Sequence, residues 1–316
     1  MQRLCRAVVC IAAALALSAV SASAQTFNFR STGFVTPAAI NQSGAIAGYF
    51  CCAYSIGFDG PQPEFHAFSL QSGGQAFKIA EPVGAQNSLA TGISPHGDLV
   101  GGFCNADCAQ GVAMHGYLFS SSSNAAQQID VPGAVATLAG GINRAGQIVG
   151  MSCSTPACGL NYPSESHGFL LDHIGGTFSP IDFPNVLGTA ATAINDAGEI
   201  VGNYLSCKTP GRGSSSPCLY AQGHGFYLTG GTFTSLDPPG SISTSVTGIN
   251  NSGEIVGTYL DGSNKTHGFV FNAGVFTDVD FPAAAITVVN GVNDRGEIVG
   301  YAQKGSAIEN FIGRPQ

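Results

Sequence analysis

The chain of 316 residues contains no tryptophan, and only 9% of its residues carry a charged side chain. The absence of tryptophan argues against a sugar-stacking platform, although Tyr and Phe could substitute for it. The chain also lacks the long amphipathic pattern of a surface helix. It is instead rich in glycine, with 44 residues, and in short runs of Val, Ile, Phe and Thr, which together are typical of an all-β protein.

Motifs of common enzymes are missing as well. The sequence has no G-x-S-x-G nucleophile elbow, no phosphate-binding Walker loop and no H-E-x-x-H zinc motif. Sialidase-like propellers carry an aspartate box with a tryptophan, which this chain cannot supply. These absences exclude several hydrolase classes and leave the repetition within the chain as its most informative feature.

Residues 1–24 have the pattern of a secretory signal peptide. Arg3 and Arg6 precede an apolar run from Ala7 to Val20, and small residues lead to a cleavage site after Ala24. The run is too short for a comfortable membrane span, which disfavours the alternative of a retained anchor. We therefore expect a secreted or periplasmic protein whose mature chain has no membrane span.

The mature chain, residues 25–316, is acidic. Without the two arginines of the signal it keeps nine basic and 19 acidic residues, a formal charge of −10. Nucleic acid is disfavoured as a partner because its phosphates need a basic surface, and the same argument applies to anionic membranes. The expected partner is an extracellular or periplasmic protein or a glycan.

One segment, close to (A/G)-I-N-x-x-G-x-I-V-G, recurs six times along the mature chain. Its copies begin at Ala39, Gly92, Gly141, Ala193, Gly248 and Gly291. A second segment, H-(A/G)-(F/Y), follows five of these copies, at His66, His115, His167, His224 and His267. Self-similarity at such a period indicates a repeat architecture in which each copy is one supersecondary unit.

The tripeptide His66-Ala67-Phe68 and the I-N-x-x-G-x-I-V-G segments make the chain resemble the HAF-repeat family of extracellular bacterial proteins. The resemblance extends over essentially the whole mature chain. It implies an exported repeat protein. It transfers no catalytic residue to this sequence, because no reaction is assigned to the family.

Each repeat is predicted to form four strands. The Asn-x-x-Gly step, as in Asn143 to Gly146, suits a tight turn after the first strand, and a pair such as Gly230-Gly231 suits the turn before the fourth. Four antiparallel strands per repeat are the pattern of a propeller blade. We predict a single all-β domain over residues 25–316, a six-bladed β-propeller of four-stranded antiparallel blades. An open β-solenoid or a sandwich is the alternative.

The two ends of the chain suggest how this ring closes. The last repeat provides a third strand at Asn310-Phe311-Ile312 and then ends without a fourth. Thr26 to Phe29 reads as an alternating strand with no partner before it. We predict that this N-terminal strand pairs with the C-terminal blade and completes it, with Asn28 opposite Glu309.

In five repeats a histidine that begins strand three lies 13 or 15 residues before an acid that ends strand four. A hairpin turn at the midpoint would place the two side chains opposite each other. A His–carboxylate pair could act as a general base or bind a metal. Five similar copies, each roughly 10 Å from the innermost strand, instead favour a structural role. The predicted structural pairs are His66 with Glu81, His115 with Asp130, His167 with Asp182, His224 with Asp237, and His267 with Asp280.

Eight cysteines remain in the mature chain, all between strands two and three of the first four repeats. An oxidising compartment favours disulfides, and a zinc site would need four ligands close together, which cysteines on different blades cannot provide. We predict bridges within three loops, Cys104 to Cys108, Cys153 to Cys158 and Cys207 to Cys218. The adjacent Cys51 and Cys52 either form a vicinal bridge or stay separate.

Repetition without a one-off catalytic arrangement favours a non-catalytic binding or scaffold module of unknown ligand. The alternative is a hydrolase or lyase that acts on an extracellular polymer. No catalytic, cofactor-binding or metal-ligating residue is predicted, and calcium binding by loop carboxylates is a weaker third option because the acids are scattered. Any binding surface is expected on the face that carries the disulfide loops.

Overall fold

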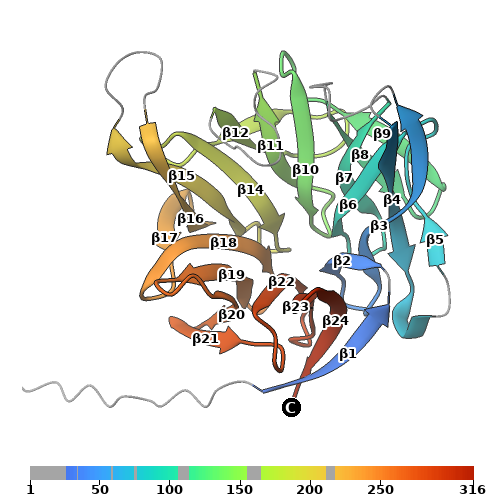
Figure 1. The fold of residues 1–316 in the computed structure, drawn as a ribbon. Coiled ribbons are helices and arrows are strands. Elements are labelled where there is room, and N and C mark those ends of the chain that lie inside the picture. The colour runs from blue at the N-terminus through green and yellow to red at the C-terminus, as the bar shows by residue number, and fades with distance from the viewer. Residues whose placement is uncertain are drawn as a thin grey trace, which may run out of the picture.

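The computed structural model describes residues 26–33, 35–57, 60–74, 77–105, 114–154, 165–210 and 218–316 (Figure 1). Within these ranges the chain is all-β, with strands β1 to β24 and one short 3₁₀ turn at Ser72–Gly74. No helix in the described part is long and apolar enough to span a bilayer.

Four sheets contain four antiparallel strands each, in chain order. The first consists of β2 (Thr36–Ile40), β3 (Ile46–Gly57), β4 (Gly60–Leu70) and β5 (Phe77–Ile79). The second consists of β6 (Asn87–Ile93), β7 (Leu99–Cys104), β8 (His115–Ser120) and β9 (Ala125–Ile129). The third consists of β10 (Ala136–Ile142), β11 (Ile148–Cys153), β12 (Ser166–Leu171) and β13 (Phe178–Ile181). The fourth consists of β14 (Gly188–Ile194), β15 (Ile200–Pro210), β16 (Cys218–Thr229) and β17 (Thr232–Leu236).

The fifth sheet contains eight strands and combines two repeats. One half consists of β18 (Ser241–Ile249), β19 (Ile255–Asp261), β20 (Thr266–Asn272) and β21 (Val275–Val279). The other half consists of β22 (Ile286–Val292), β23 (Ile298–Lys304), β24 (Ala307–Pro315) and β1 (Phe27–Gly33). Separate sheets therefore number five among the described residues rather than six, because one parallel pair, Thr266 with Ile286, merges the two halves. Each four-stranded set is called a unit below, numbered one to six from β2–β5 to the set that contains β22.

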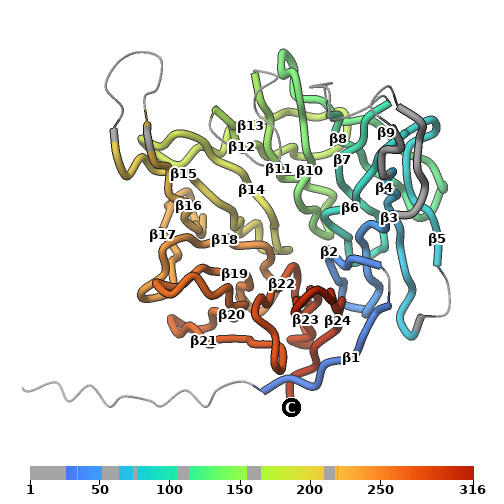
Figure 2. Tube along the Cα trace, viewed as in Figure 1, coloured from blue at the N-terminus to red at the C-terminus, as the bar shows by residue number. Residues whose placement is uncertain are grey.

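The N-terminal strand β1 lies antiparallel to β24, so the two ends of the described chain meet in unit six (Figure 2). The predicted register was wrong: Asn28 lies opposite Arg314, whereas Glu309 pairs with Ala302 of β23. The strand is longer than expected and reaches Gly33, and its position is set by Phe29. The Phe29 ring packs against the rings of Phe281 and Phe311, at centroid distances of 4.7 and 5.0 Å, which sequence periodicity could not reveal.

The first strand of every unit lies at the centre of the molecule (Figure 1). These six strands line a narrow cavity of about 70 Å³. The small residue at the start of each repeat lies on this axis, and the set is Ala39, Gly92, Gly141, Ala193, Gly248 and Gly291. A Cβ on Gly141 would lie 2.8 Å from the Cα of Ala193 in the next unit. Only glycine or alanine allows the inner strands to approach this closely.

The first three residues of the second strand are buried in every unit, because they lie between neighbouring sheets. In β7 every residue is buried, which explains the continuous I-V-G runs of the sequence. The glycine of this run makes room for an aromatic ring of strand three. A Cβ on Gly150 would lie 2.6 Å from the Phe169 ring and 2.2 Å from the Leu138 carbonyl oxygen. The repeat therefore encodes packing as well as turns.

The asparagine of each I-N pair is buried and has two roles. Its Oδ1 accepts backbone N–H groups two and four residues later, as Asn250 does from Ser252 and Glu254 at 3.0 and 2.9 Å. Its Nδ2 donates to a backbone carbonyl oxygen of the next unit, at 2.9–3.2 Å. These inter-unit bonds run from Asn41 to Ser94, Asn143 to Asn195, Asn195 to Asn250, Asn250 to Asn293, and Asn293 to Asn41.

The residue after four of the five asparagines adds a second inter-unit bond of 2.8 Å, from its backbone N–H to a side chain of the next unit. These bonds run from Arg144 to Asp196, Asp196 to Asn251, Asn251 to Asp294, and Asp294 to Gln42. Unit two departs from both patterns. Ser94 has no amide to donate, and Pro95 has neither an N–H group nor a polar side chain.

A third set of bonds joins the middle of the inner strands. In four of the six strands a side chain donates to a carbonyl oxygen of the next unit, at 2.6–3.0 Å, from Thr91 to Ala139, Thr192 to Val246, Thr247 to Val289, and Asn290 to Pro37. Units one and three have Ala38 and Gly140 at this position, and neither has a polar side chain. Unit six is thus bonded to unit one by all three sets.

We expect substitutions at Asn250 to separate its two roles. Asn250→Ala loses the acceptor and the donor, and should lower the free energy of unfolding by about 2–4 kcal/mol. Asn250→Ser should cost only about 1 kcal/mol, because a hydroxyl can accept the local N–H groups as Ser94 does from Asp98, at 3.0 Å. Denaturant unfolding measures both variants. If the serine variant is as stable as the wild type, the inter-unit bond contributes nothing.

Candidate functional site

The five histidines of the repeats all lie next to their predicted acids. The distance between imidazole Nδ1 and the nearest carboxylate oxygen is 2.9–3.2 Å in His66 with Glu81, His115 with Asp130, His167 with Asp182, His224 with Asp237, and His267 with Asp280. The strand register explains this, since Gly168 lies opposite Ile181 and therefore places His167 opposite Asp182. A cross-strand pair of this kind contributes about 0.2–1 kcal/mol.

The buried Thr or Ser seven residues after each acid fixes the corner that follows. In three units the Thr Oγ1 accepts the backbone N–H of the residue after the acid, at 3.0 Å, in Thr137 with Val131, Thr189 with Phe183, and Thr287 with Phe281. Between units one and two, Ser88 of β6 instead donates to Glu81 at 2.7 Å and accepts the Ala67 N–H. The longer acid reaches the hydroxyl directly.

The five pairs differ in their surroundings. The side chain of His267 is only 11% exposed, and its ring stacks on Tyr259 at 5.1 Å. Its Nε2 lies 3.5 Å from Asp261, so both ring nitrogens face carboxylates. The side chain of His167 is 62% exposed. The burial of each pair therefore depends on its own unit, although the pairing geometry is shared.

The pairs stay separate from one another. Among the described residues, no three or more His, Cys, Asp or Glu side chains are grouped so that they could hold a metal ion. Each pair instead occupies the outer hairpin of its own unit, where the next unit's inner strand packs against it. The described geometry thus assembles five separate local contacts, with no grouped metal ligands in that part of the chain.

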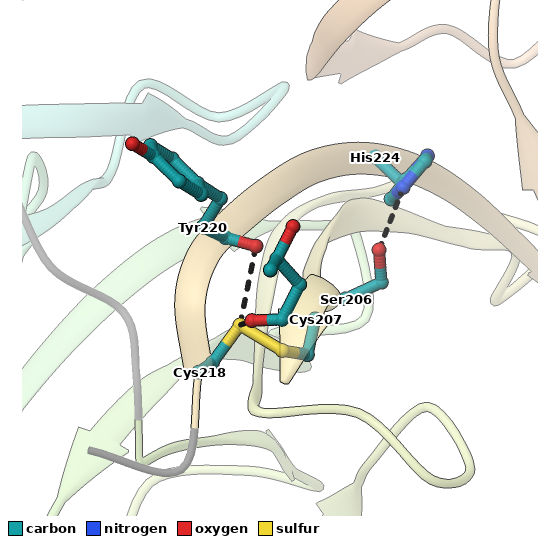
Figure 3. Close-up of a disulfide and its surroundings, with 6 residues drawn as sticks. Ser206, Cys207, Cys218, Tyr220 and His224 are labelled. Carbon is teal, nitrogen blue, oxygen red and sulfur yellow. Dashed lines mark hydrogen bonds between the residues drawn. A yellow bond between two sulfur atoms is a disulfide. The ribbon is translucent and has the colours of Figure 1, made fainter. Parts of the chain in front are cut away.

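The cysteines lie as follows. Cys207 and Cys218 form a disulfide between β15 and β16, beside the hydrogen bond of 3.0 Å between Ser206 Oγ and His224 Nε2 (Figure 3). Cys104 and Cys153 are also disulfide-bonded. Their expected partners, Cys108 and Cys158, lie outside the described residues. Cys51 is a free thiol, so it forms no vicinal bridge with Cys52, whose side chain lies outside the description.

A cleft of about 530 Å³ lies at the junction of units six and one. One wall is the β1–β24 pair, and the other is unit one near the 1→2 turn at Gly44 and the turn after β4. In an antiparallel unit these turns are on the face opposite the disulfide loops. The cleft is therefore on the face where we did not expect a binding surface.

The charge of this cleft differs from that of the protein. Its lining includes Arg30, Arg295 and Arg314 but only one acid, Glu297. The side chain of Glu297 is 10% exposed, accepts a hydrogen bond of 2.8 Å from Asn293 Nδ2, and forms an ion pair with Arg314, whose Nε lies 3.0 Å away. It also accepts from Arg295, whose Nη1 donates to the Gln42 carbonyl oxygen. Glu297 thus links the asparagine of unit six to two arginines.

Hydrogen bonds decide the ionisation of Glu297. Burial acts to raise its pKa, but hydrogen bonds from Asn293 and Arg295 and the charges of Arg295 and Arg314 outweigh burial. Its pKa therefore lies below the ordinary value of 4.5. The carboxylate stays charged through the mildly acidic range and keeps both guanidinium groups oriented.

Sequence reasoning missed the cleft because the two arginines of its closing strands are not repeated. Repeat alignment gives weight to positions shared by several units, and Arg30 and Arg314 occur only in the two strands that form the closing pair. The signal that could have pointed to the cleft was the scarcity of basic residues in the mature chain. Three of the nine basic residues of the mature chain line this one cleft.

We expect the histidine pairs to contribute unequally to stability. His267→Ala should lower the free energy of unfolding by about 1–3 kcal/mol, because it removes a buried ring and leaves Asp280 without that partner. His167→Ala should cost less than about 0.5 kcal/mol, as for exposed ion pairs. Thermal or denaturant unfolding of the two variants measures the difference. Equal losses would show that burial does not determine the contribution of a pair.

A pH titration should reveal the contribution of Glu297. Since its pKa is lower in the folded chain than in the unfolded chain, its stabilisation is complete above about pH 4.5 and is lost as the pH falls through the folded value. The difference in unfolding free energy between wild type and Glu297→Gln should therefore be largest near pH 6–7 and shrink below about pH 4. Glu309→Gln, at a site 41% exposed, is the matched control. A difference independent of pH would contradict this assignment.

Comparison with known proteins identifies the fold. No family model and no curated protein matches the chain. Solved structures similar to it include the β-propeller domain of the trilobed protease from Pyrococcus furiosus (TM-score 0.51, 11% identity, covering 90% of this chain and 83% of that one). A second is the acylaminoacyl peptidase of Pyrococcus horikoshii (TM-score 0.52, 10% identity, covering 90% of this chain and 45% of that one). A third is TolB from Acinetobacter baumannii (TM-score 0.50, 9% identity, covering 85% of this chain and 63% of that one). The chain thus spans less than two thirds of the last two. At these identities the likeness concerns architecture alone: the chain has a β-propeller fold.

Proposed function

We propose that the chain is an exported, non-catalytic binding module, in which six four-stranded units close into a ring and β1 completes the sixth. The non-catalytic interpretation rests on one observation: each His–acid pair is confined to its own unit. A catalytic base needs a neighbouring nucleophile or substrate cavity of its own, and five equivalent copies supply neither.

Closure of the ring is supported by the contacts between units six and one. Asn293 donates to Asn41, Asp294 to Gln42, and Asn290 to Pro37, with distances of 2.8–3.1 Å. These are the same three kinds of bond that join other neighbouring units. A closed ring removes exposed inner-strand edges, which would otherwise pair with other chains.

Export is supported by the pattern of residues 1–24 and by the disulfide between Cys207 and Cys218, because such bonds persist in oxidising compartments. Resemblance to HAF-repeat proteins of the extracellular space points the same way. The first similar structure is the propeller domain of a larger protease. That precedent is compatible with a propeller that binds while another part of a protein carries out the reaction.

The second candidate is a hydrolase or lyase acting on an extracellular polymer, and one experiment separates the two. We expect the purified chain of residues 25–316 to release no product from a panel of glycans and peptidoglycan, while one ligand class raises its melting temperature. His167→Ala serves as the matched variant and should leave any binding intact. Product release that disappears on substitution of one unrepeated residue would overturn the binding-module proposal. Loss of all binding in His167→Ala would overturn the structural role of the pairs.

A further inference from the structure

We propose that the cleft between units six and one binds a small organic acid, through its carboxylate at Arg30 and Arg314 and its apolar body against unit one. The inference rests on the binding function proposed above and names a ligand class and a place for it. The cleft carries a net charge of +2 from three arginines and one glutamate, within a mature chain of formal charge −10. An anion is therefore drawn to this site and repelled by the rest of the surface.

The strand register places the two arginines on the same face of one sheet. Asn28 pairs with Arg314 and Arg30 with Ile312, so Arg30 and Arg314 are diagonal neighbours across β1 and β24. Diagonal neighbours in an antiparallel pair are about 7–8 Å apart, within reach of long side chains. Two guanidinium groups at this spacing can converge on the two oxygens of one carboxylate.

The bonds within the cleft leave these groups available. Glu297 binds Arg314 through Nε at 3.0 Å, and among the described residues nothing bonds its terminal nitrogens. The side chain of Arg314 is 65% exposed. Arg30 is also exposed and has no ion pair in the described part of the chain. Arg295, in contrast, is engaged by Glu297 and Gln42, so we assign it a positioning role.

The opposite wall, formed by unit one, is mainly apolar. Ile40, Ile46, Leu70 and Phe77 line it together with Gln71 and Ser72, and Ile312 adds an apolar side chain to the β1–β24 wall. Phe77 is 45% exposed although its ring stacks on Phe68 at 5.3 Å, so it presents an apolar surface at the site. A volume of about 530 Å³ is in the range of pockets that hold small organic ligands. Basic groups on one wall and apolar groups on the other suit an amphipathic acid better than a sugar or an inorganic anion.

Isothermal titration of residues 25–316 tests the assignment. The probes are straight-chain carboxylates from hexanoate to decanoate, 3-phenylpropionate, and the neutral isostere 3-phenylpropanol. We expect saturable binding of at least one acid, and the binding should weaken as the salt concentration is raised. 3-Phenylpropionate should bind at least about tenfold more tightly than its neutral isostere 3-phenylpropanol. Absence of saturable binding across the acid series, or equal affinity for acid and alcohol, would overturn the proposal.

Matched arginine variants locate the site. Arg30→Gln and Arg314→Gln should each weaken acid binding at least about fivefold. Arg144→Gln is the control, because Arg144 lies at a 1→2 turn on the same face but is paired with Asp196 at 3.1 Å, away from the cleft. It should leave the affinity within about twofold. An equal loss in all three variants would assign binding to the general charge of this face and reject the cleft.

Two further arms keep the outcomes distinct. Phenyl phosphate tests the alternative oxyanion. If the protein binds phenyl phosphate more than about tenfold more tightly than 3-phenylpropionate, the carboxylate assignment is rejected.

Circular dichroism and the melting temperature of each variant establish that it is folded. Lys substitutions at Arg30 and Arg314 keep the positive charge if the Gln variants unfold. Failure to bind acids leaves the polymer panel unaffected, so this inference and the proposed function can fail separately.

Discussion

The fold depends on a buried asparagine amide that satisfies its own turn and reaches the neighbouring unit. An unpaired amide at such a site would cost several kcal/mol, so the inner strands must sit where each Nδ2 finds a carbonyl oxygen. The small residues on the axis make this possible. Gly141 and Ala193 let adjacent strands approach until the amide of Asn143 lies 3.1 Å from the Asn195 oxygen. Where the asparagine is present, the length of this hydrogen bond limits how far apart neighbouring units can lie.

The outer hairpins are organised by a different rule. There the side chains face each other within a unit, and His–acid pairs and threonine corners determine where the chain leaves one unit for the next. The His–acid contacts act within a unit, whereas the asparagine contacts and the threonine corners join one unit to the next. The same repeat therefore contains two recurring polar sets, Asn near the axis and His near the rim, and each makes structural contacts of its own.

Most of the architecture could be predicted from the sequence because it is periodic. The turn at Asn143 to Gly146, the buried I-V-G strands and the opposition of His167 and Asp182 all follow from spacing that recurs in several units. The register of β1 could not be predicted, because a single strand has no second copy to align and the Phe29 contacts are long-range. Thr266 and Ile286, which merge two units into one sheet, likewise lie outside the repeat pattern. The basic cleft was missed for the same reason, since its arginines occur once each.

The departure of unit two has a consequence for how cohesion is distributed around the molecule. Ser94 and Pro95 leave the junctions on either side of unit two with a single bond each from the three inter-unit sets in the described chain, Asn41 to Ser94 and Thr91 to Ala139. The junction of units six and one, close to where the chain's ends meet, has all three. The junctions of units four with five and of five with six also have all three, so the closing junction is bonded as fully as they are. The place where the ring closes is therefore no weak point in this network, although only non-covalent contacts hold β1 to β24.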